Sequence, residues 1–133
     1  MDRRREFRID DRFLEKVTGE LAPGGAGSLE ERYLRINREM RQANNAVLEK
    51  LAARTAPKFL WTGRLERWPR AATQSEFADI RSYVYRGRQI DEQVHLGVDL
   101  ASTKQAAVTA AGAGVVIFAE KLGIYGNCVV IDH

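Results

Sequence analysis

Residues 94–101 read Val94-His95-Leu96-Gly97-Val98-Asp99-Leu100-Ala101 and place an imidazole and a carboxylate four positions apart in an otherwise apolar run. In a regular strand such positions lie on one face but about 13 Å apart, because each residue advances the chain by roughly 3.3 Å. Two ligands of one zinc ion each lie about 2 Å from the metal, so His95 and Asp99 can share an ion only if the chain bends between them. Gly97 lies between them and tolerates the kinked backbone that this bend requires.

The chemistry of this pair points to a metal half-site. Imidazole and carboxylate together suit a borderline ion such as Zn²⁺, and a catalytic zinc site takes three protein ligands with a water in the fourth position. The pair is one ligand short of that number. In the alternative interpretation His95 is an ordinary hydrogen-bonded histidine at a strand end and Asp99 is a turn or capping residue. The spacing alone leaves both interpretations open.

The His95–Asp99 motif occurs together with two further features of the sequence. The motif is HLGVD at residues 95–99, and the two features are the small-residue stretch VTAAGAGVV at residues 108–116 and YGN at residues 125–127, directly before the apolar run CVVID. With this combination, residues 83–133 resemble the lysostaphin-type (LytM) zinc metallopeptidases. The resemblance implies that His95 and Asp99 bind Zn²⁺.

The rest of that family's site has no counterpart in this sequence. Members of the family continue into a segment with a catalytic histidine and then into a His-x-His motif, whose second histidine is the third zinc ligand. Only two histidines occur here, and His133 falls where the family often has a histidine just after a strand, so we interpret it as a strand-end residue. The chain therefore has two of three implied ligands and no assigned catalytic residue, and we expect it to be inactive alone.

The resemblance implies a function together with a fold. The expected function is that of a zinc metalloendopeptidase acting on peptidoglycan peptides, located in the cell envelope, either periplasmic or extracellular. The alternative is a non-catalytic interaction module that binds or activates other cell-wall enzymes. Retention of His95 and Asp99 argues against this alternative, whereas the missing third ligand argues for it. A shortened piece of a longer protein is a third interpretation.

The fold class predicted from the patterns is α+β, beginning with a helical extension over residues 1–56. Residues 10–21 have apolar side chains at helical spacing, and a glycine-rich break follows at residues 23–27. Ser28 and Glu31 form a capping-box pattern at the start of a long helix. The apolar stripe of this helix steps by three or four residues and consists of Leu29, Tyr33, Ile36, Met40, Ala43, Val47 and Leu51. Its arginines are expected to face water.

Residues 57–133 are predicted to form a partial, β-rich peptidase domain that lacks its carboxy-terminal strands. Aromatic and β-branched runs broken by glycine predict strands of an antiparallel sheet at residues 59–63, 82–87, 115–119 and 128–132, with a loop at residues 122–127 joining the last two. If the chain stops after the last strand, one edge is unpaired. We therefore expect self-association or a partner chain that completes the sheet.

The charge distribution bears on other partners. Residues 1–70 contain sixteen Lys and Arg against eleven Asp and Glu, and residues 71–133 contain five against seven. The basic residues of the long helix alternate with glutamates, and no aromatic residues interleave to stack bases, so a solvated face is predicted and no nucleic-acid partner. No apolar stretch is long enough to span a membrane, and the amino terminus has no signal-peptide pattern. Gly112-Ala113-Gly114 predicts a tight turn, because no third glycine and no helix follow.

Overall fold

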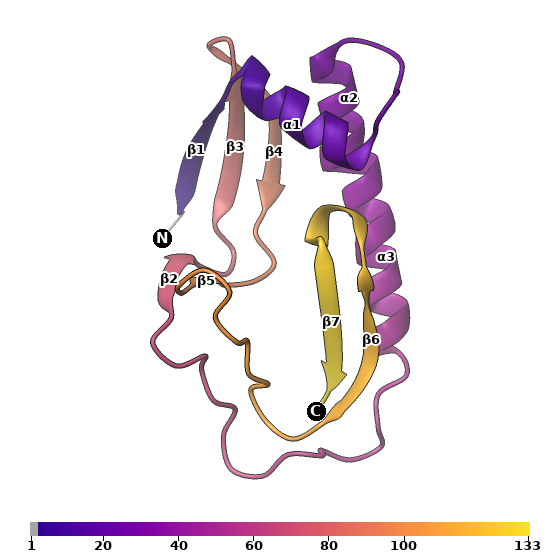
Figure 1. The fold of residues 1–133 in the computed structure, drawn as a ribbon, viewed down its shortest axis with the longest axis vertical. Coiled ribbons are helices and arrows are strands. Elements are labelled where there is room, and N and C mark those ends of the chain that lie inside the picture. Colours follow the sequence, from indigo (N-terminus) through magenta and orange to yellow (C-terminus); the bar gives the residue numbers. More distant parts are fainter. Residues whose placement is uncertain (1–2) are drawn as a thin grey trace. The chain divides into compact units, whose positions relative to one another are not determined.

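The computed structural model describes residues 3–133 and has the α+β fold class that the sequence predicts. The helices and strands are β1 (Arg4–Ile9), α1 (Asp11–Leu21), α2 (Leu29–Arg35), the π-helix η1 (Ile36–Met40), α3 (Arg41–Ala52), β2 (Ala72–Ser75), β3 (Ile80–Tyr85), β4 (Arg88–Val94), β5 (Asp99–Ala101), β6 (Val115–Lys121), the 3₁₀ turn η2 (Gly123–Tyr125) and β7 (Asn127–Asp132). The strands form one three-stranded sheet and two two-stranded sheets, and α2, η1 and α3 follow one another as a long helical run (Figure 1).

The chain divides into two compact units that interleave along the sequence. The first unit contains the described residues up to Leu34 together with Arg70–Ala106, and the second contains Arg35–Pro69 and Ala107–His133. The division predicted from the sequence, residues 1–56 and 57–133, describes two consecutive segments and stays a prediction. We describe each unit by itself.

The first unit has a three-stranded sheet in the order β1-β3-β4. β3 and β4 form an antiparallel hairpin, whereas β1 pairs with β3 in parallel. The hairpin turn consists of Arg86 and Gly87, both with positive φ, which suits the right-handed twist of paired strands. The sequence predicts β3, but β1 and β4 are not predicted. The prediction of an antiparallel sheet is wrong for β1 and β3, which pair in parallel.

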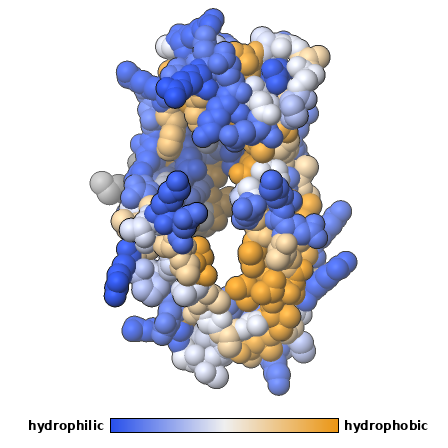
Figure 2. All heavy atoms as spheres, viewed as in Figure 1, coloured by the Kyte–Doolittle hydropathy of each residue, from blue (hydrophilic) through white to orange (hydrophobic). Residues whose placement is uncertain are grey.

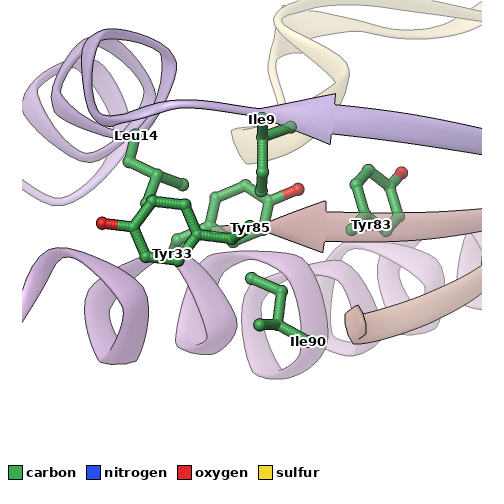
Figure 3. Packing of buried hydrophobic residues seen from close by; sticks show 6 residues of the cluster. All are labelled: Ile9, Leu14, Tyr33, Tyr83, Tyr85 and Ile90. Carbon is green, nitrogen blue, oxygen red and sulfur yellow. The ribbon is translucent and has the colours of Figure 1, made fainter. Parts of the chain in front are cut away.

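The core of this unit is formed by side chains from both helices and all three strands of the sheet (Figure 3). Its buried members are Ile9, Leu14, Tyr33, Tyr83, Tyr85 and Ile90. Tyr33 packs edge-on against Tyr83, with ring centroids 6.1 Å apart. Each such side chain contributes roughly 1.5–3 kcal/mol when it is fully buried. The core therefore fixes α1 and α2 against the sheet that leads into residues 94–101.

The helical starts follow the predicted capping chemistry. The Asp10 side chain accepts from the Phe13 amide at the start of α1 (2.8 Å). The capping box is confirmed, because the Ser28 amide donates to Glu31 Oε2 (2.7 Å) and the Glu31 amide donates to Ser28 Oγ (3.2 Å). The prediction that the arginines face water is wrong for Arg32. Its guanidinium is half-buried and donates to the Ala22 carbonyl at the end of α1 (2.9 Å).

The second unit pairs the β6–β7 hairpin with α3 (Figure 1). Both strands and the loop between them are confirmed. Two asparagines of α3 hold that loop: Asn44 Oδ1 accepts from the Ile124 amide (3.0 Å), and Asn45 Oδ1 accepts from the Tyr125 hydroxyl (2.5 Å). Exposed apolar side chains gather on the hairpin (Figure 2), including Val115, Val116 and Val129.

The predicted strand at residues 59–63 is wrong. This stretch is irregular, Phe59 is largely exposed, and Gly63 has a φ of 77° that breaks an extended run. Farther along the same connection, the Glu66 amide donates to the Ala111 carbonyl (2.7 Å). A single hydrogen bond of this kind does not make a β-ladder. Among residues 3–133, no helix is long and apolar enough to cross a membrane.

Candidate metal centre

His95 and Asp99 lie together in the first unit, as their shared ion would require. β4 ends at Val94 and β5 begins at Asp99, so the chain bends over the residues between them. The bend brings His95 Nε2 to 3.1 Å from Asp99 Oδ1. Gly97 does not use a positive φ in this bend, and an added Cβ would lie 3.9 Å from His95 Nε2. The bend is as the spacing predicts, but it does not depend on the special conformational freedom of glycine.

The His95 ring is oriented by a backbone carbonyl. Its Nδ1 lies 2.8 Å from the Glu76 carbonyl oxygen. A carbonyl can only accept, so the proton of this hydrogen bond is on Nδ1, and in the neutral ring Nε2 carries the lone pair. The His95 side chain is 12% exposed and the Asp99 side chain 51% exposed. The pair is thus anchored on the histidine side and open to solvent on the carboxylate side.

Asp99 is held through its other oxygen. Arg81 Nη2 donates to Asp99 Oδ2 over 2.5 Å, and the side chain of Arg81 is largely buried. In the β2–β5 pair, Ser75 is the residue opposite Asp99. The two carboxylate oxygens therefore have different roles: one is neutralised by the guanidinium and the other faces the histidine.

This arrangement fits two ligands of one zinc ion. A neutral imidazole nitrogen and a carboxylate oxygen are both acceptors, and at 3.1 Å they repel unless a proton or a metal cation lies between them. Two ligand atoms on a tetrahedral zinc ion with bonds of about 2.0–2.2 Å lie roughly 3.3–3.6 Å apart, slightly farther than in this pair. Donor type and spacing thus both suit Zn²⁺.

A third ligand is not found among residues 3–133. No group of three or more His, Cys, Asp or Glu side chains in this part of the chain could hold a metal ion. His133 follows β7, and its Nδ1 lies 2.9 Å from the Ala113 carbonyl oxygen. It is a strand-end residue, as the sequence predicts.

Sequence reasoning missed the residues that support the pair. Glu76, Asp79 and Arg81 come from the β2–β3 turn and from β3, about fifteen to twenty positions before their targets. The local sequence around Ser75 and Asp79 carries a weak turn signal, because both residue types often bond to nearby backbone. Only the strand register, which places Arg81 opposite Gln93, brings this turn to His95 and Asp99.

Comparison with known proteins points to the segment that contains His95 and Asp99. No curated protein matches the chain. A comparison with models of protein families finds a match that begins just before His95 and includes β5, β6 and β7. Residues 93–133 match the model of Peptidase family M23, the lysostaphin-type (LytM) family, which is consistent with a partial peptidase domain.

Proposed function

We propose that this chain is part of a zinc metalloendopeptidase that cleaves peptidoglycan peptides and works in the cell envelope. The match to Peptidase family M23 supports a peptidase-type function. The observation that carries the finer proposal is the 3.1 Å approach of His95 Nε2 to Asp99 Oδ1 within the matching segment, with the ring fixed by the Glu76 carbonyl.

The residues present have distinct tasks in this proposal. His95 and Asp99 hold the ion, the Glu76 carbonyl keeps the His95 lone pair on Nε2, and Arg81 holds the carboxylate in place. When bound, Zn²⁺ lowers the pKa of its water to about 7 and polarises the scissile carbonyl. Asp99 is half exposed, so the side of the pair next to the carboxylate is accessible to substrate.

Zinc titration of the purified chain tests the metal site. We expect weak, saturable binding of one Zn²⁺, because two ligands hold the ion less firmly than three. His95→Ala should weaken binding at least about tenfold, since losing a ligand exceeds the effect of losing an outer partner. His133→Ala removes the other imidazole and is the matched control. Equal zinc affinity in His95→Ala and the wild type would disprove the assignment.

Cosedimentation with purified cell walls tests the substrate class. We expect zinc-dependent cosedimentation that His95→Ala abolishes and His133→Ala retains. The same mixture should show no lysis above a blank, because the described residues lack a third ligand and an assigned proton-handling histidine. Cell walls that leave the wild-type chain in the supernatant, with and without zinc, would contradict the substrate assignment.

One observation favours the second candidate, a non-catalytic interaction module. The Arg81–Asp99 ion pair satisfies one oxygen of the carboxylate, Oδ2, without a metal. A melting curve at saturating zinc distinguishes the two functions, because a ligand that binds only the folded state raises its stability. The peptidase proposal expects a higher melting temperature with zinc, and the module expects no change.

The exposed valines of the β6–β7 hairpin support self-association with a second copy of the chain. Val116 and Val129 are both more than half exposed on this hairpin, and contiguous apolar surface of this kind favours contacts between molecules. We expect the mass from light scattering to rise with protein concentration, and Val129→Lys to suppress the rise. Val108→Lys makes the same change at an exposed valine outside the strands. A concentration-independent monomer mass for the wild type would contradict self-association.

A further inference from the structure

A single buried carboxylate closes the turn between β2 and β3. The Asp79 side chain is fully buried at 0% exposure. Its Oδ2 accepts from the Ser75 hydroxyl (2.9 Å) and from the Glu76 amide (3.0 Å), and it pairs with Arg5 Nε at 3.2 Å. We call residues 75–79 the Asp79 turn. Three contacts of the turn converge on this one oxygen.

The Asp79 turn contacts His95 at three points. The His95 amide donates to the Asp79 carbonyl (2.9 Å), and the Ala78 amide donates to the His95 carbonyl (2.8 Å). The third contact is the 2.8 Å hydrogen bond between His95 Nδ1 and the Glu76 carbonyl. Both the backbone and the ring of the histidine are therefore set by the same short turn.

The turn also reaches Asp99, through a relay of side chains. The Ser75 hydroxyl donates its proton to Asp79, so its lone pair is available to accept from Arg81 Nη2 at 3.0 Å. The same nitrogen donates to Asp99 Oδ2. Asp79 is thus connected to both members of the metal pair, to His95 through the backbone and to Asp99 through Ser75 and Arg81.

Stability alone is a poor explanation for this carboxylate. Burying a charged group is strongly unfavourable unless it is well paired. The other oxygen of Asp79, Oδ1, is buried and has no hydrogen-bond partner among the described residues. The side chain is therefore only half satisfied, and what it does achieve is to fix the turn that carries the Glu76 carbonyl.

We propose that Asp79 is a positioning residue for the zinc half-site, holding Glu76 against His95 and Ser75 against Arg81 and Asp99. This inference rests on the proposed function and deepens it, because it names the residue outside the ligand pair that sets the pair's geometry. A backbone carbonyl that orients a ligating histidine cannot be removed by mutation. The position of the Glu76 carbonyl can instead be changed through Asp79, whose side chain can be replaced. Loss of such outer partners weakens metal binding by about 10- to 100-fold.

The first measurement is made on the metal-free chain. In ¹H–¹⁵N spectra of the imidazoles, we expect wild-type His95 to show a proton on Nδ1, and Asp79→Ala to shift it toward a mixture of tautomers. His133, whose Nδ1 also faces a carbonyl, serves as an internal reference. A folded Asp79→Ala variant with an unchanged His95 tautomer and unchanged zinc affinity would overturn the proposal.

The second measurement is zinc affinity in a series of variants. Asp79→Ala is expected to weaken zinc binding by about 10- to 100-fold. The zinc affinity of Asp79→Asn should lie between those of the wild type and Asp79→Ala, because an amide oxygen can still accept both hydrogen bonds but cannot form the ion pair with Arg5. Asp132→Ala is the matched control, since Asp132 also accepts from a hydroxyl and a backbone amide but lies in the second unit. An equal loss in Asp132→Ala would count against a specific role for Asp79.

A further pair of variants covers the case in which Asp79→Ala fails to fold. Ser75→Ala removes the hydroxyl that Asp79 and Arg81 share, whereas Ser75→Thr keeps one. We expect weaker zinc binding in Ser75→Ala and recovery in Ser75→Thr, and equal wild-type affinity in both would overturn the relay. If the wild-type chain binds no zinc but the His95 tautomer still responds to these changes, the proposed function fails while the positioning role of Asp79 stands.

Discussion

At the residue scale, the sequence predicts the His95–Asp99 pair but not what orients it. Residue types and spacing raise the possibility of the pair, because imidazole and carboxylate four positions apart need only a bend to meet, and the family resemblance selects it over the alternative. Arg81 and Asp79 could not be found in the same way. Their role depends on the pairing of β3 with β4, and strand register is a property of the folded sheet rather than of either strand.

Glycine is required at position 114 for a reason that the sequence does not show. The Gly112-Ala113-Gly114 motif predicts a tight turn, yet Gly114 has no positive φ. A Cβ at this position would lie 2.5 Å from the Asp132 carbonyl oxygen and 2.7 Å from Ile131 Cγ2. Glycine is therefore needed here because another backbone approaches closely.

We expect Gly114→Ala to destabilise the chain by about 1–3 kcal/mol, the usual range for an overpacked site. The neighbouring oxygen belongs to the backbone of β7, so the clash is relieved only by shifting the hairpin. Gly19→Ala is the control of opposite sign. Position 19 lies in α1 with no atom within 4 Å of the added Cβ, and alanine in a helix interior is favoured by about 0.5–1 kcal/mol. Urea unfolding measures both, and a Gly114→Ala variant as stable as the wild type would contradict the close approach.

At the element scale, local signals predict how helices begin but not how they continue. The Ser28–Glu31 capping box is predicted and confirmed because all its atoms lie within four residues. The π-helix η1 is not predicted. There, Arg41 Nε donates to the Asn37 carbonyl (3.1 Å) and Nη2 to the Asn37 side chain (2.7 Å), and a side chain that takes a backbone acceptor perturbs the regular ladder.

The connection after α3 is tied to the end of β7 by Asp132. Its carboxylate accepts from the Thr55 hydroxyl and from the Ala56 amide, each at 2.7 Å. These two hydrogen bonds hold the pKa of Asp132 below its ordinary value, and the one from Thr55 has the larger effect. A carboxyl whose folded-state pKa is lowered adds stability above its unfolded pKa, and this stability is lost as the pH falls through the folded value.

We therefore expect Asp132→Asn to be less stable than the wild type at pH 7. The difference should begin to shrink below about pH 4, where the carboxyl of the unfolded chain takes up a proton, and should be lost once the pH falls below the lowered folded-state pKa. Urea unfolding across this pH range measures the difference. Glu120→Gln makes the same acid-to-amide change at an exposed position on β6 and removes neither hydrogen bond. A stability difference for Asp132→Asn that stays constant down to the lowest pH would show that the charge of Asp132 does not contribute.

At the scale of the whole molecule, the fold class is predictable but the pairing of strands that are distant in the sequence is not. The sequence pattern changes from helical spacing to strand-like runs at about residue 57, which favours a simple order of helices followed by strands. The structure instead pairs β1, near the amino terminus, with β3 in parallel, about seventy-five positions later. β1 is rich in charged residues, so its sequence gives no strand signal, and its pairing depends on the core that Ile9 joins. Non-local pairing of this kind is what local patterns cannot specify.

The interleaved units make a prediction about how the chain loses structure. Leu14 is fully buried in the core of the first unit, and Leu122 is buried in the second. Leu→Ala at such sites typically costs about 2–5 kcal/mol, because the lost apolar contacts are joined by a cavity that the surroundings fill only in part. If each unit is stabilised mainly by its own core, Leu14→Ala should reduce hydrogen-exchange protection first in β3 and β4, and Leu122→Ala first in β6 and β7.

Mass spectrometry of peptides after hydrogen exchange reads both units in one experiment, so each variant is the other's control. The expected result is reciprocal loss of protection. The same variants should differ in zinc binding, because the His95–Asp99 pair lies in the first unit. Zinc binding should fall in Leu14→Ala. It should persist in Leu122→Ala at a temperature where only the second unit has lost protection. Equal loss of protection throughout the chain in both variants would show instead that the two units unfold as one cooperative body, with the helical run from α2 to α3 coupling them.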